Sequence, residues 1–177
     1  MDVLAILAAR EIENLRIVES VTGLIEYQTP HLEALGVYAE YKAIHFAYTQ
    51  LAGIETSQEA LKRALFIQWF CLTEPPFLSG IGDIDRQAEL AVLTQLEHLL
   101  GNSQIDAELT AMLSYYSTWE YVFQRPEFLH LAALQAFVEI HVAVDTSSVS
   151  QLTQINEMAG RGQMGTYWQS LGSSNVL

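Results

Sequence analysis

The stretch that decides the fold is SQEALKRALFIQWFC, residues 57–71. After Arg63 only Gln68 interrupts a run of apolar side chains, which are Ala64, Leu65, Phe66, Ile67, Trp69 and Phe70. A helix that is apolar on nearly every side must be surrounded by other elements. Thr56 and Glu59 have the Thr-x-x-Glu spacing of a capping box, which predicts the start of this helix. The sequence therefore predicts a buried central helix over residues 57–71.

The rest of the chain has the periodicity and the breakers of further helices. Apolar residues recur at helical spacing over residues 3–26, and Thr29-Pro30 predicts the start of a second helix that ends at Gly53. Further starts are predicted at Asp83 or Asp85, at Ser103 to Asp106, at Pro126, and at Thr146 to Ser148. We expect an all-α fold, in which a single domain (residues 1–177) forms a bundle of six to eight helices around residues 57–71.

Residues 137–145 are the segment with the periodicity of a strand. Val138, Ile140, Val142 and Val144 alternate with less apolar residues. A strand needs a partner, and the sequence offers no second segment of this kind. A helix is therefore the preferred prediction for residues 137–145.

The charge balance narrows the classes of partner. The chain has 8 basic and 21 acidic residues, a net charge of −13, which argues against binding to nucleic acid or to an anionic membrane. No apolar stretch approaches the roughly 20 residues that span a bilayer, and no signal peptide is recognisable, so a cytoplasmic location is expected. The single cysteine, Cys71, excludes an internal disulfide and a multi-cysteine zinc site.

The low content of charged residues suggests that another chain covers part of the surface. Only 16% of the residues are charged, against about 25% in an average globular protein. We expect a homo-oligomer, most simply a two-fold dimer. A basic protein partner is the other expectation, because the surface must be strongly acidic.

The predicted second helix carries a candidate ligand site. Tyr38, Tyr41, His45 and Tyr48 fall within an arc of roughly 80° on a helix. Three phenols around an imidazole are typical of the polar groups that line a small-molecule pocket. The alternative is an aromatic packing face whose hydroxyls reach water or carbonyl groups.

A candidate metal site follows Pro126, where Glu127 and His130 form a Glu-x-x-His motif. On a helix the two side chains are neighbours, and di-iron bundles use two copies of this motif. Only one copy is present, and Glu127 has the alternative role of an acidic residue in a first helical turn. The loop from Glu74 to Asp83, which contains two prolines, is predicted to form a wall of a pocket.

No complete catalytic constellation is recognisable, so the favoured interpretation is a non-catalytic acidic helical protein. It would act through protein–protein association, as a homo-oligomer, with a basic partner, or both. The alternative is a helical protein that binds a small molecule or a metal through the tyrosine–histidine face or through Glu127 and His130. The sequence identifies no cofactor and leaves open whether the protein is an enzyme.

Overall fold

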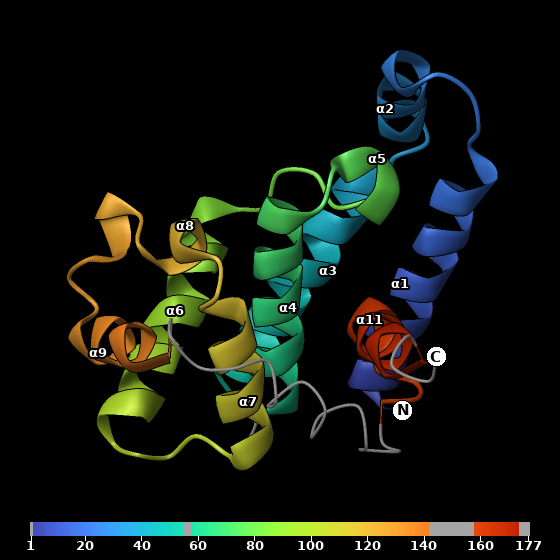
Figure 1. Cartoon of the computed structure of the whole chain (residues 1–177). Helices are drawn as coiled ribbons and strands as arrows, with labels where there is room; N and C mark the ends of the chain where they lie inside the picture. The colour runs from blue at the N-terminus through green and yellow to red at the C-terminus, as the bar shows by residue number, and fades with distance from the viewer. Residues whose placement is uncertain (1, 55–57, 142–157, 174–177) are drawn as a thin grey trace.

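The computed structural model describes residues 2–54, 58–141 and 158–173, and within them every regular element is helical (Figure 1). This confirms the all-α prediction. The helices are α1 (Val3–Ser20), α2 (Ile25–Ala34), α3 (Val37–Ala52), α4 (Glu59–Thr73), α5 (Pro76–Ser79), α6 (Arg86–Gly101), α7 (Ala107–Tyr116), α8 (Glu120–Phe123), the 3-10 helix η1 (Pro126–Phe128), α9 (Ala132–His141) and α11 (Gly162–Ser173). Both α5 and α8 have only 4 residues. The other α-helices of the described part number eight, the upper end of the predicted range.

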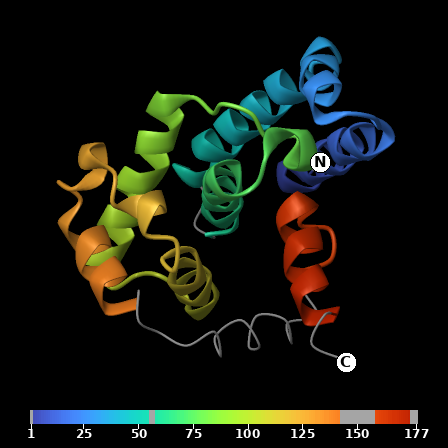
Figure 2. The same cartoon turned by 45° about the horizontal axis from the view of Figure 1, so that its top comes forward.

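The helix α4 lies at the centre of the molecule, as predicted. Every residue from Ala60 to Trp69 is buried, and α3, α5, α6, α7 and α11 all pack against this helix. Figures 1 and 2 show α6, α8 and α9 on one side of α4, and α1 and α11 on the other. The helix begins at Glu59. Thr56 lies outside the described residues, so the capping box stays a prediction.

The helix predicted from Thr29 to residue 52 is in fact two helices. The first, α2, begins at Ile25, so Pro30 lies inside it and not in its first turn. The chain then breaks at Gly36, which has a φ of +77°, and α3 begins at the next residue. This left-handed conformation is costly for residues with a Cβ, so the glycine sets the break. In α2 only Leu32 is buried, and Figure 1 shows α2 projecting from the body of the protein.

The loop after α4 turns back onto the core through Gly80. Its φ is +74°, and a Cβ there would lie 2.7 Å from Cγ2 of Val18 and 3.0 Å from Cε2 of Tyr41. The close approach brings Ile81 into the core, whereas Leu78 of α5 is 57% exposed. One part of this loop therefore packs on the core and another part faces outward.

The second half of the chain follows the predicted helix starts up to Pro126. The side chain of Asp85 accepts a hydrogen bond from the amide of Ala88, and Asp106 caps α7 in the same way. After Pro126 the chain forms only the short η1, and the next helix, α9, starts at Ala132. Residues 137–141 are helical, whereas residues 142–145 and the start predicted at Thr146 to Ser148 lie outside the described residues. No helix in the described ranges combines the length and the apolar character needed to cross a membrane.

Candidate functional site

The predicted tyrosine–histidine face of α3 lies against the protein core. Tyr41, His45 and Tyr48 are fully buried, and Tyr38 is half-buried. The hydroxyl of Tyr48 donates to Oε1 of Glu11 at 2.5 Å, and the hydroxyl of Tyr41 lies 3.4 Å from the backbone oxygen of the same residue. None of these four side chains lines the cavity between α1, α4, α5 and α11 or the charged cavity beside Cys71. The alternative of a packing face describes this arrangement better than a ligand pocket does.

His45 is held as a neutral imidazole. Its Nε2 lies 3.0 Å from Nε2 of Gln68, an amide nitrogen that can only donate, so the imidazole accepts there. The proton is then on Nδ1, which has no hydrogen-bond partner in the described part of the chain. Burial lowers the pKa of His45 to about 4. His45 is therefore not placed to exchange protons near neutral pH.

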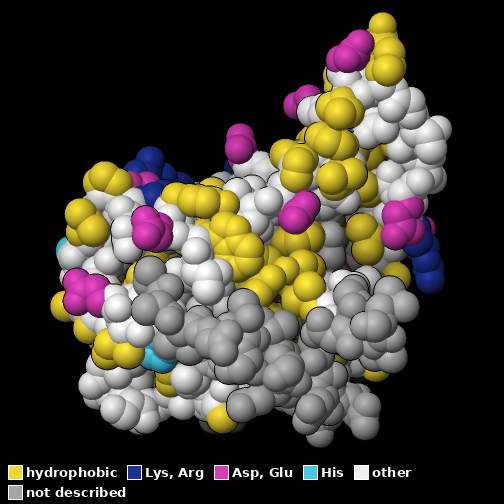
Figure 3. Space-filling model, in the orientation of Figure 1, with side chains coloured by type: hydrophobic (Ala, Val, Ile, Leu, Met, Phe, Trp, Pro, Cys, Tyr) yellow, Lys and Arg dark blue, Asp and Glu magenta, His cyan; other side chains and the backbone are white. Residues whose placement is uncertain are grey.

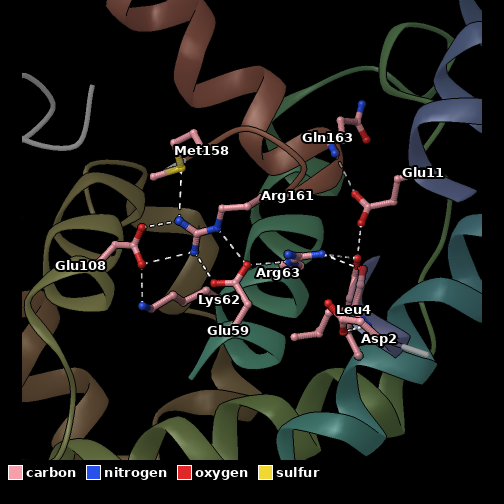
Figure 4. Close-up of polar contacts among 11 residues, drawn as sticks. Asp2, Leu4, Glu11, Glu59, Lys62, Arg63, Glu108, Met158, Arg161 and Gln163 are labelled. Carbon is pink, nitrogen blue, oxygen red and sulfur yellow. Dashed lines mark hydrogen bonds and ion pairs between the residues drawn. The ribbon is translucent and has the colours of Figure 1, made fainter. Parts of the chain in front are cut away.

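Glu11 joins three helices through one buried carboxylate. It lies on α1 and is 1% exposed. One oxygen accepts from Tyr48 of α3, and the other accepts from the backbone amide of Gln163 in the first turn of α11, at 3.0 Å (Figure 4). Burial raises the pKa of Glu11 to about 7. A Cβ on Gly162 would lie 2.5 Å from this carboxylate, so only glycine leaves room for the contact.

A buried ion network fixes the start of α11 on α4 and α7. Arg161 binds Glu59 of α4 through Nε at 2.8 Å and Glu108 of α7 through Nη2 at 3.2 Å. Lys62 binds Glu108, and Arg63 binds Glu59, each at 2.6 Å (Figure 4). All three cations are less than 10% exposed. Removing one partner would leave a charge buried without compensation, which is far more costly than losing a surface ion pair.

Helix α11 forms one wall of an open cavity of about 230 Å³, which also lies between α1, α4 and α5. Gln163 forms part of its wall, and Nε2 of this residue donates to the backbone oxygen of Ser79 at 2.9 Å. The cavity is lined by Leu15, Phe70, Glu74, Leu78, Ser79, Gln163, Thr166, Tyr167 and Ser170. Glu74, Leu78 and Ser79 come from the loop of residues 74–83, which the sequence predicts to form a wall of a pocket.

Next to this cavity lies a surface that we call the apolar ridge. Its side chains are at least 50% exposed: Leu24, Ile25, Tyr27 and Leu35 in and beside α2, and Leu78 in α5. Because α2 and α5 are in contact, the two groups lie on neighbouring elements. Figure 3 shows hydrophobic side chains from α2 across α5 to the middle of this face, with Lys and Arg only at its margins. Such a surface is unusual for a protein that acts alone.

Carboxylates without ion-pair partners accompany the apolar ridge. Glu19 lies in the last turn of α1, Glu26 and Glu33 lie on α2, and Glu74 caps the end of α4. Within the described residues, none of these four side chains forms an ion pair. The ridge thus combines exposed apolar groups with uncompensated negative charge.

The two residues of the Glu127-x-x-His130 motif do not share one face of an α-helix, contrary to the prediction. Glu127 belongs to η1, and His130 lies in the exposed turn before α9. Pro126 starts a 3-10 helix that ends at Phe128, so His130 lies beyond it and is not on the same helix as Glu127. Glu127 instead contacts Arg86 at 3.4 Å and Arg125 at 3.8 Å. Across residues 2–54, 58–141 and 158–173, no three His, Cys, Asp or Glu side chains are placed to hold a metal ion.

Cys71 lies beside the same arginines, in the wall of a charged cavity of about 600 Å³. Its thiol donates to the backbone oxygen of Gly82 at 2.9 Å, and burial raises its pKa to about 11. The group is therefore a thiol near neutral pH and a poor nucleophile.

Comparisons with family models, with curated proteins and with solved structures find no match for this chain. Sequence reasoning missed Glu11, Arg161 and Gln163. The available signals are weak: Glu11 interrupts the apolar stripe of its helix, and the other two lie in the glycine-rich segment of residues 160–165.

Proposed function

We propose that this protein is a non-catalytic interaction module whose apolar ridge binds a basic, amphipathic segment of a partner protein. The observation that carries the proposal is the ridge itself, with Ile25 57% exposed and Tyr27 68% exposed on a helix that projects from the body. Burying such side chains against a partner gains roughly 25 cal/mol for each Å² of apolar surface removed from water.

The distribution of charge supports a basic partner. Of the 8 basic residues, all six arginines contact carboxylates, Lys62 is buried in the ion network, and Lys42 of α3 lies in the wall of the charged cavity beside Cys71. The negative charge at Glu19, Glu26 and Glu33 is left for a partner to neutralise. An amphipathic helix with Lys or Arg beside its apolar stripe matches both the ridge and its carboxylates.

A second copy of the chain is the less favourable occupant of the ridge. Two ridges placed face to face would bring their unpaired carboxylates together, and like charges repel. The dimer expected from the sequence stays a prediction, as does the cytoplasmic location. Light scattering at micromolar concentration measures the mass directly, and the mass of one chain is 19.8 kDa.

A defined peptide tests the proposal. We would titrate a fluorescent helical peptide of Leu and Lys at amphipathic spacing and an analogue in which every Lys is Glu. Binding of the Lys peptide should be saturable, should weaken as salt is added, and should exceed binding of the Glu analogue. The double variant Ile25→Gln, Tyr27→Gln removes exposed apolar side chains on two sides of α2, and it should bind the Lys peptide at least about tenfold more weakly.

The matched control is Ile140→Gln, because Ile140 is also exposed (69%) but lies on α9. Equal affinity of the double variant and the wild type would show that the ridge is not the binding surface. If the wild type has the mass of a dimer and the double variant has the mass of a monomer, the ridge would instead be assigned to a second copy of the chain.

A further inference from the structure

A second exposed surface lies along α3 and α6, which pack against each other. Ile54, just after α3, is 80% exposed, and Leu90 on α6 is 40% exposed. Phe46, one helical turn before Gln50 on α3, is 51% exposed. Between the two helices runs an open groove of about 790 Å³, lined by Thr49, Gln50, Gly53, Ile54, Gln87, Leu90, Ala91, Thr94, Gln95 and His98. We call Phe46 and the lining of this groove the α3–α6 face.

The α3–α6 face is neutral, although the chain has 21 acidic residues. Among the described residues that line the groove, none is Asp, Glu, Lys or Arg, and residues 43–54 contain no such residue. Residues 87–98 of α6 contain two carboxylates, and both are used elsewhere. Glu89 pairs with Arg125, and Glu97 accepts hydrogen bonds from two backbone amides of α9. A centre depleted in charged residues is typical of a protein–protein interface.

The charge distribution favours a second copy of the chain as the occupant of this face. Two copies, each with a net charge of −13, repel each other, because like charges oppose close approach. The repulsion between facing side chains is weakest where both surfaces are neutral. A basic partner gains no electrostatic attraction from a neutral face, whereas it does from the unpaired carboxylates of the apolar ridge.

The polar groups of the α3–α6 face are complementary to themselves. A two-fold interface places the same patch on both copies, so each group must be able to contact its own kind. A side-chain amide meets this requirement because it has both donors and an acceptor. Gln50 of α3 and Gln87 of α6 are exposed on this face. Their amides can bond to the same amides of a second copy, beside the apolar side chains of Ile54 and Leu90.

We propose that the α3–α6 face binds the same face of a second copy of this chain, with the two-fold axis crossing the groove beside Ala91. Ala91 is near the middle of the α6 wall, between Gln87 and Gln95, and its methyl group lets two α6 helices approach closely. Leu90 and Ile54 of both copies then lose contact with water. The interface does not involve the apolar ridge, so the proposal does not depend on the ridge having a partner.

Sedimentation equilibrium of the full chain measures this association directly. We would cover about 1 to about 200 µM, because a small interface is expected to give a micromolar dissociation constant. The mass should rise from the 19.8 kDa of one chain towards twice that value. In NMR spectra the methyl groups of Ile54 and Leu90 should shift on dilution, whereas those of Ile140 on α9 should not. A constant monomer mass, or dilution shifts on α9 in place of α3 and α6, would overturn the proposal.

Two charge variants at Ala91 test the two-fold geometry. Ala91→Glu and Ala91→Lys each place two like charges beside the axis, so each variant alone should dimerise at least about tenfold more weakly. An equimolar mixture of the two should dimerise again, because Lys then faces Glu, a recovery that misfolded chains would not show. Ala136→Glu, which changes an exposed alanine on α9, is the matched control and should leave the dissociation constant unchanged.

Dimerisation of Ala91→Glu at wild-type strength, or a mixture that stays monomeric, would contradict the proposed axis and overturn the proposal. A dimer that dissociates only in Ile25→Gln, Tyr27→Gln would also overturn it, because the interface would then be the apolar ridge. Ala91→Glu should still bind the peptide of Leu and Lys. Failure of the dimer proposal and failure of the interaction proposal are therefore separable.

Discussion

Glu11 stabilises the tertiary structure at the scale of a single residue. Its carboxylate accepts hydrogen bonds from Tyr48 and from the backbone of Gln163, a residue 152 positions later in the chain. The contact orients the first turn of α11, and thereby places Gln163 in the wall of the cavity. An anionic carboxylate is also favourable at a helix N-terminus, because the free amides there carry partial positive charge.

The close contact between Gly162 and Glu11 can be tested with two glycine variants. Gly162 and Gly160 have φ values of +64° and +76°, but only at Gly162 would a Cβ meet a neighbour within 4 Å. Gly160→Ala should cost only the strain of the left-handed conformation, about 1–2 kcal/mol. Gly162→Ala should cost about 2 kcal/mol more by chemical denaturation. Equal losses for the two variants would mean that the contact does not constrain this position.

The buried carboxylate of Glu11 also predicts a dependence of stability on pH. Its pKa is raised from 4.5 to about 7 in the folded state, so the folded protein holds this proton more tightly than the unfolded chain. The resulting stabilisation is complete below about pH 4.5 and is lost as the pH rises through 7. The free energy of unfolding of the wild type relative to Glu11→Gln should fall over this range, by on the order of 3 kcal/mol.

His45 changes the stability of the protein with pH in the opposite direction. Its pKa is lowered from 6.5 to about 4, so its contribution is present above pH 6.5 and is lost as the pH falls through 4. In Glu11→Gln, stability should therefore rise between pH 4 and 6.5. The control is Glu19→Gln, an exposed carboxylate on the same helix, whose stability curve should run parallel to that of the wild type. If the free energy of unfolding of Glu11→Gln varied with pH in parallel with that of the wild type, the raised pKa of Glu11 would be contradicted.

At the scale of elements, α4 was predictable because its own composition requires burial. A helix without a polar face has no orientation that leaves one side in water, whatever surrounds it. The same reasoning failed between α2 and α3, where residues on both sides of Gly36 keep a helical pattern. Periodicity does not reveal a break that depends on the left-handed conformation of one glycine.

The central position of α4 predicts a large effect of Trp69→Ala. Trp69 is 1% exposed, and its ring centroid lies 4.8 Å from that of Tyr116 and 5.2 Å from that of Trp119. The substitution should cost about 3–5 kcal/mol, because it leaves a cavity among packed rings. Leu72→Ala, on the same helix at 38% exposure, should cost about 1 kcal/mol or less by the same denaturation measurement. Similar losses for both variants would contradict the central position of Trp69.

At the scale of the whole molecule, the candidate site was less predictable than the fold. The pattern of α3 identifies a face with Tyr41 and Tyr48, but it does not say that Glu11 and α11 cover that face. The cavity wall combines residues from Leu15 to Ser170, so it exists only after distant helices pack. Sequence periodicity indicates which face of a helix is buried and not the partner against which it packs.

The proposed partner surface is tested most directly by amide hydrogen exchange of the full chain, with and without the Leu–Lys peptide. The helix α2 has one buried residue, Leu32, so its amides should exchange rapidly in the free protein, whereas those of α4 should be protected. With the peptide bound, we expect α2 and α5 to gain protection and α9 to remain unchanged. Protection that appears on α9, or no change on α2 at saturating peptide, would contradict the proposal that the apolar ridge is the binding surface.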